Sequence, residues 1–93
     1  MTTHALTQLS NTEATRLTPL GLHSGMDITL QNVNTEGYIY IGGDDTVSSA
    51  NYGFRIMPNH SISFELPSVD ALYAIGSTTM NLALMQTGLE SQN

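Results

Sequence analysis

Histidines and a pair of aspartates are the residues of this chain whose types could support chemistry. Histidine can be a general base or a metal ligand, but His4, His23 and His60 lie far apart and share no metal-ligand spacing. Asp44 and Asp45 follow two glycines, yet no EF-hand pattern surrounds them, and a calcium ion needs about six to eight oxygen ligands. Adjacent acids in a turn usually act as turn formers. The sequence therefore predicts no metal site.

The residue types of a nucleophilic triad also occur, in the short stretch that contains His23, Ser24 and Asp27. Adjacency in sequence is not triad geometry, and no G-x-S-x-G elbow accompanies them. Carboxylates such as Glu36 and Glu65 could pair for glycoside hydrolysis, but a chain without tryptophan offers little of a sugar-binding cleft. The sequence thus predicts a protein that is not an enzyme and that needs no cofactor.

The balance of charge limits the partners that the chain can bind. Its 93 residues include no lysine and no cysteine, and two arginines stand against eight carboxylates, for a net charge of −6. Nucleic acid binding needs a basic footprint, and anionic membranes attract basic segments. We therefore expect no nucleic acid and no membrane among the partners. The N-terminus also lacks the charge and hydropathy pattern of a signal peptide, and a cysteine-free chain fits assembly in a reducing cytosol.

Alternation of apolar and polar residues is the clearest structural signal. Over residues 60–66, apolar side chains at positions 62, 64 and 66 alternate with polar ones, and residues 26–31 repeat the pattern. Strand side chains point to opposite faces in turn, so each segment predicts a half-buried β-strand. Further short strands are expected over residues 13–17, 38–41, 54–56, 72–75 and 81–85.

The spacing of strands and turns predicts an all-β fold, a small antiparallel β-sandwich of jelly-roll or immunoglobulin-like topology with about seven or eight short strands. We expect one domain over residues 21–88, preceded by a flexible N-terminal arm and a possible first edge strand in residues 1–20. Residues 89–93 are expected to form a frayed tail. The segment Asn34–Gly37 is typical of a four-residue hairpin connection, with Gly37 at positive φ.

The segment Gly43–Gly53 is the longest stretch without a core pattern. Loops of this length are uncommon in compact domains and often carry function. Tyr52 lies near its tip, whereas Tyr38, Tyr40 and Tyr73 fall in expected strands and are predicted to pack within the sheet. The sequence therefore predicts that contacts with a partner are made by this loop, through residues Asp44, Asp45, Asn51 and Tyr52, and by the N-terminal arm.

The order of strand and turn motifs resembles a loose group of small β-sandwich proteins encoded among the virion structural genes of tailed bacteriophages. The resemblance covers about residues 22–85, and the N-terminal residues 1–20 and the Asp44-Asp45 pair depart from the shared pattern. The segments that carry it are Ile28–Asn34, Tyr38–Gly43, Thr46–Phe54, Met57-Pro58, Ser61–Leu66 and Leu72–Gly76.

The resemblance implies a non-enzymatic virion protein that is assembled in the host cytoplasm, above all a capsid decoration (cement) protein that stabilises the head shell. Its partner would be the major capsid protein or another virion protein. It would form a homo-oligomer, and a trimer would match the local threefold positions of a capsid shell. The alternative is a carbohydrate- or receptor-binding module of a tail or head fibre.

Overall fold

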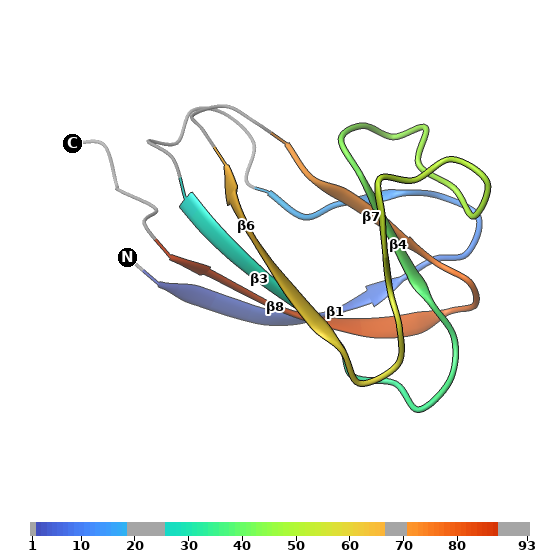
Figure 1. Cartoon of the computed structure of the whole chain (residues 1–93), viewed down its shortest axis with the longest axis horizontal. Coiled ribbons are helices and arrows are strands. Elements are labelled where there is room, and N and C mark those ends of the chain that lie inside the picture. The colour runs from blue at the N-terminus through green and yellow to red at the C-terminus, as the bar shows by residue number, and fades with distance from the viewer. Residues whose placement is uncertain (1, 19–25, 67–70, 88–93) are drawn as a thin grey trace.

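The chain folds into two antiparallel β-sheets that pack face to face, which confirms the predicted all-β sandwich (Figure 1). The structure, a computed structural model, describes residues 2–18, 26–66 and 71–87, and no described residue is helical. The first sheet has the strand order β1-β8-β3-β6 and the second β2-β7-β4-β5. The strands are β1 (Thr3–Leu9), β2 (Thr15–Arg16), β3 (Met26–Asn32), β4 (Ile39–Gly42), β5 (Phe54–Ile56), β6 (Ser61–Leu66), β7 (Tyr73–Gly76) and β8 (Met80–Thr87).

The strand order is that of a jelly roll. The first strand pairs with the last, β2 pairs with β7, β3 with β6 and β4 with β5, so the chain resembles one long hairpin rolled into two sheets. The additional pairs β3–β8 and β4–β7 join these hairpin pairs into two four-stranded sheets. This order selects the jelly-roll alternative over the immunoglobulin-like one.

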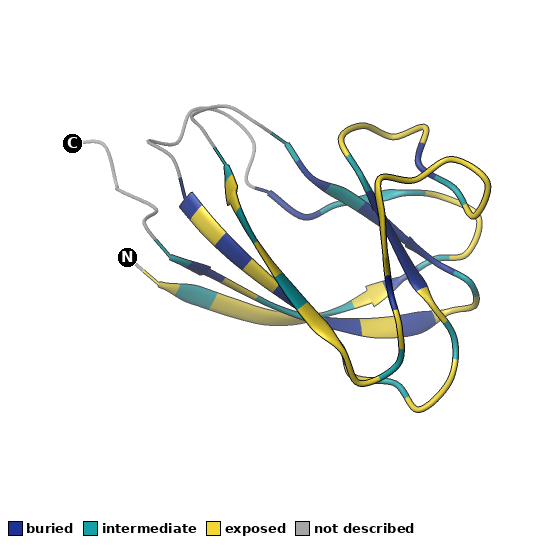
Figure 2. Cartoon of the chain, viewed as in Figure 1, coloured by how far each residue is buried: buried dark blue, intermediate teal, exposed yellow. Residues whose placement is uncertain are grey.

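The core lies between the sheets and is built by strand alternation. In β3, buried and exposed residues alternate without a break, and Figure 2 shows this strand striped dark blue and yellow. Ile28 and Leu30 are completely buried, and they face Ile39 and Ile41 of β4 within one apolar cluster. In β6 the same alternation is weaker, because its apolar side chains are only partly buried at the edge of the sheet.

The N-terminal segment is integrated into the sandwich as edge strands, which agrees with the possible first edge strand that we expected there and differs from the flexible arm. Strand β1 pairs with β8 over its whole length and forms the edge of the first sheet, and β2 adds to β7 in the second. Leu9 and Leu17 anchor the two strands in the core. The physical reason is that burial of these leucines, together with a full ladder of backbone hydrogen bonds, outweighs the weak local pattern of the segment.

The segment Asn34–Gly37 is a crossover between the two sheets, so the hairpin prediction for it is wrong. Gly37 does take a positive φ, of 92°. The crossover is held by Asn32, a completely buried side chain whose amide donates to the carbonyl oxygens of Gly37 and Ile56 at 3.1 Å. Its own oxygen accepts from the side-chain amide of Asn34 at 2.7 Å. This buried amide therefore ties β3, β5 and the crossover together with its hydrogen bonds satisfied.

The connection of residues 43–53 joins β4 to β5 within the second sheet, and it therefore projects beside that sheet instead of crossing to the other layer. Because it stays with the second sheet, this connection covers the outer face of that sheet and not of the first. In the described part of the chain, no helix has the length and apolar character that crossing a membrane would require.

Candidate functional site

The long loop folds back over the outer face of the second sheet and forms a small core of its own there. Val47 is buried and clusters with Tyr40 of β4 and Ile75 of β7, whose side chains point away from the main core. Two backbone hydrogen bonds between Ser48 and Asn51, at 2.8 and 3.1 Å, shape the tip of the loop. The loop is therefore packed against the sheet through Val47, which leaves only its exposed side chains for contact with a partner.

The four predicted contact residues all lie exposed on this loop. Asp44 accepts hydrogen bonds from the hydroxyl and the backbone N–H of Thr46, and these bonds hold the pKa of its carboxyl below its ordinary value. Asn51 donates to the carbonyl oxygen of Thr46 at 3.2 Å. The ring of Tyr52 packs against the ring of Tyr40, with 4.9 Å between centroids. Much of what Asp44 and Asn51 do is thus to shape the loop, and their contact with a partner stays a prediction.

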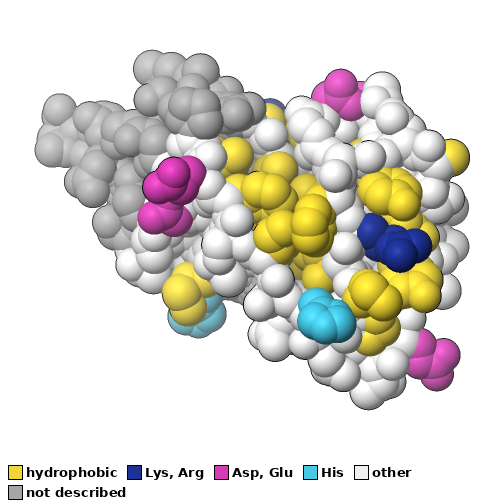
Figure 3. All heavy atoms as spheres, in the orientation of Figure 1, with side chains coloured by type: hydrophobic (Ala, Val, Ile, Leu, Met, Phe, Trp, Pro, Cys, Tyr) yellow, Lys and Arg dark blue, Asp and Glu magenta, His cyan; other side chains and the backbone are white. Residues whose placement is uncertain are grey.

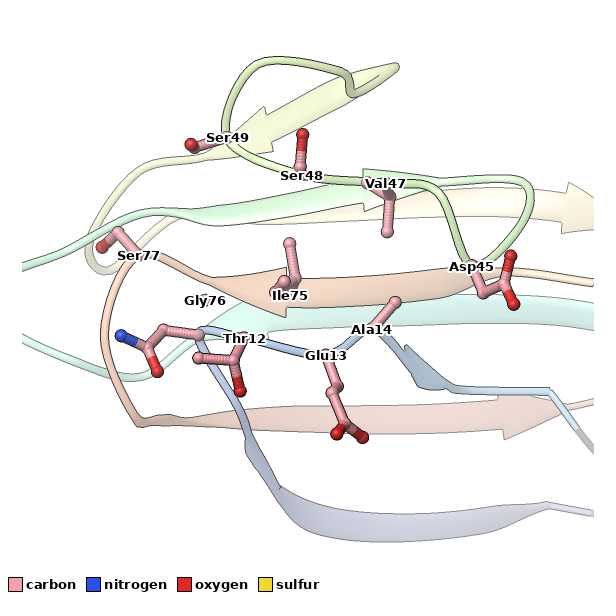
Figure 4. Close-up of a pocket in the computed structure, with 11 residues that line it drawn as sticks. Thr12, Glu13, Ala14, Asp45, Val47, Ser48, Ser49, Ile75, Gly76 and Ser77 are labelled. Carbon is pink, nitrogen blue, oxygen red and sulfur yellow. The ribbon is translucent and has the colours of Figure 1, made fainter.

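Asp45 lies apart from the other three, at the rim of a polar hollow of about 640 Å³ between the loop and the segment that joins β1 to β2. In Figure 4, Val47 points toward Ile75 and Ala14 at the floor of this hollow. The carboxylates of Glu13 and Asp45 lie well apart at its edge (Figure 4). The two carboxylates do not point toward one another in this view.

The other chemistry-bearing residues do not come together in the described part of the chain. His4 and His60 are exposed on β1 and after the turn at Pro58, and Asp27 is exposed on β3. No three histidine or acidic side chains among residues 2–18, 26–66 and 71–87 form a group that could hold a metal ion. His23 and Ser24 lie outside the described residues, so the triad hypothesis stays untested.

The outer face of the first sheet is bare, since no described segment crosses it. Leu6 is 66% exposed and Met85 48% exposed. With Ala83 they line an apolar groove of about 400 Å³, flanked by His4, Ala5, Thr29, Gln31 and Leu84. Leu6 and Ala83 are direct neighbours across the β1–β8 pair. This face offers apolar surface that the fold itself does not use.

A second exposed surface lies where the edges of the two sheets, β5 and β6, approach each other. Phe54 of β5 is 41% exposed and meets Phe64 of β6 edge to face, with 6.4 Å between ring centroids. The guanidinium of the adjacent Arg55 lies 4.7 Å from the ring centroid of Tyr38, and Met57 is also exposed. We call these five residues the Arg55 patch. Figure 3 shows apolar side chains gathered on this face around an arginine.

The Arg55 patch was not predicted from the sequence, and the expectation that Tyr38 packs within the sheet is wrong. Tyr38 precedes β4 and is more than one-third exposed. A local pattern cannot reveal this patch because it joins residues from the crossover, β5 and β6. The usable signal was compositional, since tyrosine, phenylalanine, methionine and arginine are the residues enriched at protein interfaces.

Comparison of the chain with protein-family models, curated proteins and solved structures finds no match.

Proposed function

We propose that the protein is a non-enzymatic structural protein of a bacteriophage virion that decorates and stabilises the head shell. The observation that carries the proposal is the Arg55 patch, in which Phe54 meets Phe64 edge to face, the guanidinium of Arg55 lies over the ring of Tyr38, and Met57 is exposed. Such residues make up the energetic centres of protein interfaces. The partner would be the major capsid protein or another virion protein, consistent with the resemblance of the sequence to phage structural proteins.

The charge of the chain supports a protein partner. Its net charge of −6 opposes binding to nucleic acid, and Arg55 is the one cation within the exposed patch. An acidic or aromatic group on the partner could pair with this guanidinium. Many copies bound to one shell would add their weak contacts by avidity, so the individual interface could be small.

Binding to purified heads tests this proposal. Heads that lack the protein should bind a fixed number of copies when it is added back, and should regain resistance to heating. Tyr38→Ala and Phe54→Ala should each weaken binding by about 1–2 kcal/mol, as expected for aromatic residues at an interface centre. Met85→Ala, which removes a similarly exposed side chain on the other face, is the matched control.

Heads that neither bind the protein nor lose heat resistance without it would contradict the decoration role. Equal binding by all three variants would contradict the assignment to the Arg55 patch.

A carbohydrate- or receptor-binding module of a fibre is the second candidate, and the polar hollow favours it. Its rim carries the hydroxyls of Thr12, Ser48, Ser49 and Ser77 and the carboxylates of Glu13 and Asp45 (Figure 4). Hydroxyl and carboxylate groups are suited to hydrogen bonds with sugar hydroxyls. In a titration with host-surface glycans, this function predicts chemical-shift changes at Asp45 and Ser49 that leave the Arg55 patch unchanged.

A further inference from the structure

We infer that two copies of the chain associate through β1, so that two first sheets join into one continuous sheet across a twofold axis. The sandwich has four edge strands, and three of them carry features that discourage pairing. Strands β2 and β5 have two and three residues and include arginines. Strand β6 carries Glu65, which lies directly opposite Asp27. Strand β1 has seven residues with no carboxylate, lysine, arginine or proline.

The charge distribution of the chain favours a second copy as the occupant of this edge. Two chains of net charge −6 repel each other wherever their carboxylates approach. Strands β1 and β8 contain no acidic residue, whereas the acidic residues of the described part lie elsewhere, at Glu13, Asp27, Glu36, Asp44, Asp45 and Glu65. Among the described residues, the β1–β8 side is therefore where two identical chains can approach with the least repulsion.

The direction of the backbone groups in β1 follows from the register of the sheet. Asn32 at the end of β3 donates its N–H to the carbonyl oxygen of His60, at 2.9 Å. Backbone groups of alternate residues point to opposite sides of a strand. Because Asn32 points its N–H toward β6, Thr29, three residues earlier, points its N–H and C=O the other way, toward its partner Met85 in β8. By the same alternation, Leu84 points its N–H and C=O toward β1.

Leu84 faces Ala5 in the register of β1 and β8, so Ala5 directs its backbone groups into the sheet. His4, Leu6 and Gln8 then direct theirs to the free edge, where no described residue pairs with them. An antiparallel pair centred on Leu6 places Leu6 against Leu6 of the second copy and His4 against Gln8. This register uses all of these groups in about six interchain hydrogen bonds.

The side chains fit the same register. Leu6 is two-thirds exposed and borders the apolar groove with Ala83 and Met85. Antiparallel pairing at Leu6 brings the two grooves side by side, so that the leucines bury each other between them. No like charges meet in this register, because the facing residues are leucine, histidine and glutamine. The predicted assembly is a dimer, in contrast to the trimer that the resemblance to virion proteins suggested.

Sedimentation equilibrium of the full chain tests the dimer. The wild-type chain should show a reversible monomer–dimer equilibrium. Leu6→Lys and Leu6→Glu should each weaken it at least about tenfold, because like charges would face each other across the axis. Mixing these two variants should restore a heterodimer, since residue 6 faces residue 6. Ser63→Lys, in the middle of the other long edge strand, should leave the dimer unchanged.

Hydrogen exchange gives a readout that needs no substitution. The amides of His4, Leu6 and Gln8 should become protected as the protein concentration rises, while those of Ser61, Ser63 and Glu65 should not. A chain that is monomeric at all concentrations, a trimer, or a dimer that Ser63→Lys abolishes and Leu6→Lys spares would overturn the inference. A mixture of the two Leu6 variants that stays monomeric would overturn the register centred on Leu6. Each of these results is independent of whether the protein binds phage heads.

Discussion

The two outer faces of this sandwich differ in how far the rest of the chain covers them. On the second sheet, Tyr40 and Ile75 point outward but are buried beneath Val47 of the long loop. On the first sheet, Leu6 and Met85 point outward and remain largely exposed. Each face carries apolar side chains, although those of the first sheet are confined to β1 and β8 because β3 and β6 turn polar residues outward. The second face is covered by an eleven-residue connection. The comparison teaches that the long loop buries the apolar side chains of one outer face, whereas no described segment buries those of the other.

The largest expected effect comes from placing a charge at the centre of the covered face. Val47→Asp should reduce the free energy of unfolding by about 3 kcal/mol, because a carboxylate would replace a buried methyl pair beside Tyr40 and Ile75. Met85→Asp on the bare face should change it by less than about 0.5 kcal/mol. Urea unfolding followed by circular dichroism measures both. Equal losses in the two variants would show that the faces do not differ in packing.

A smaller effect is expected from crowding the joint where the loop leaves β4. A β-carbon at Gly42 would come within 2.9 Å of the Val47 side chain, whereas one at Gly43 would meet no atom within 4 Å. Gly42→Ala should therefore destabilise the protein by about 2 kcal/mol, in the range of overpacked cores. Gly43→Ala is the matched control, and thermal unfolding compares the two. A neutral Gly42→Ala would mean that Val47 is free to move away from the sheet.

The aromatic contact at the loop tip should contribute less. Tyr52→Ala removes the ring that packs on Tyr40 at 4.9 Å, and we expect a loss of about 1 kcal/mol. Tyr52→Phe keeps the ring and should retain wild-type stability in the same unfolding assay. If the phenylalanine variant loses as much as the alanine variant, the hydroxyl and not the ring contact holds the loop.

The smallest effect is a dependence of stability on pH at the start of the loop. Because hydrogen bonds from Thr46 lower the pKa of Asp44 below 3.8 in the folded protein, its ionised form stabilises the fold. This contribution is present above pH 3.8 and is lost as the pH falls below that value through the folded pKa. Asp44→Asn should flatten the corresponding part of the stability profile. Thr46→Ala should flatten it partly, since the backbone donor remains, and an unchanged profile in both variants would contradict the assignment.

The strands that the sequence predicted best are those whose pattern matches their burial. Apolar and polar residues alternate in the sequences of β3 and β6. Both strands, and the face of the sheet on which each side chain lies, could therefore be predicted. Strand β1 could not, because it has threonine and alanine at inward positions while Leu6 points outward. The segment Asn34–Gly37 was predicted as a hairpin because a hairpin and a crossover between sheets both need a turn. Contacts distant in sequence decide which sheet the next strand joins, and here β4 joins the second sheet.

The candidate sites show the same limit. The exposure of Tyr52 agrees with the loop prediction, but Val47 in the same loop is buried, and nothing in its local pattern indicated this. The Arg55 patch depends on the approach of β5 and β6, which are the edges of different sheets. A surface assembled from separate segments becomes visible only when the topology is known.

The difference between the two faces can be measured directly by adding a soluble paramagnetic agent to the protein and recording methyl resonances. In the monomer, at low protein concentration, the methyl signals of Leu6 and Met85 should broaden strongly, because both side chains are exposed on the bare face. Those of Val47 and Ile75 should persist beneath the loop. Comparable broadening of all four would contradict the account, since it would mean that the loop leaves the second sheet as open to solvent as the first.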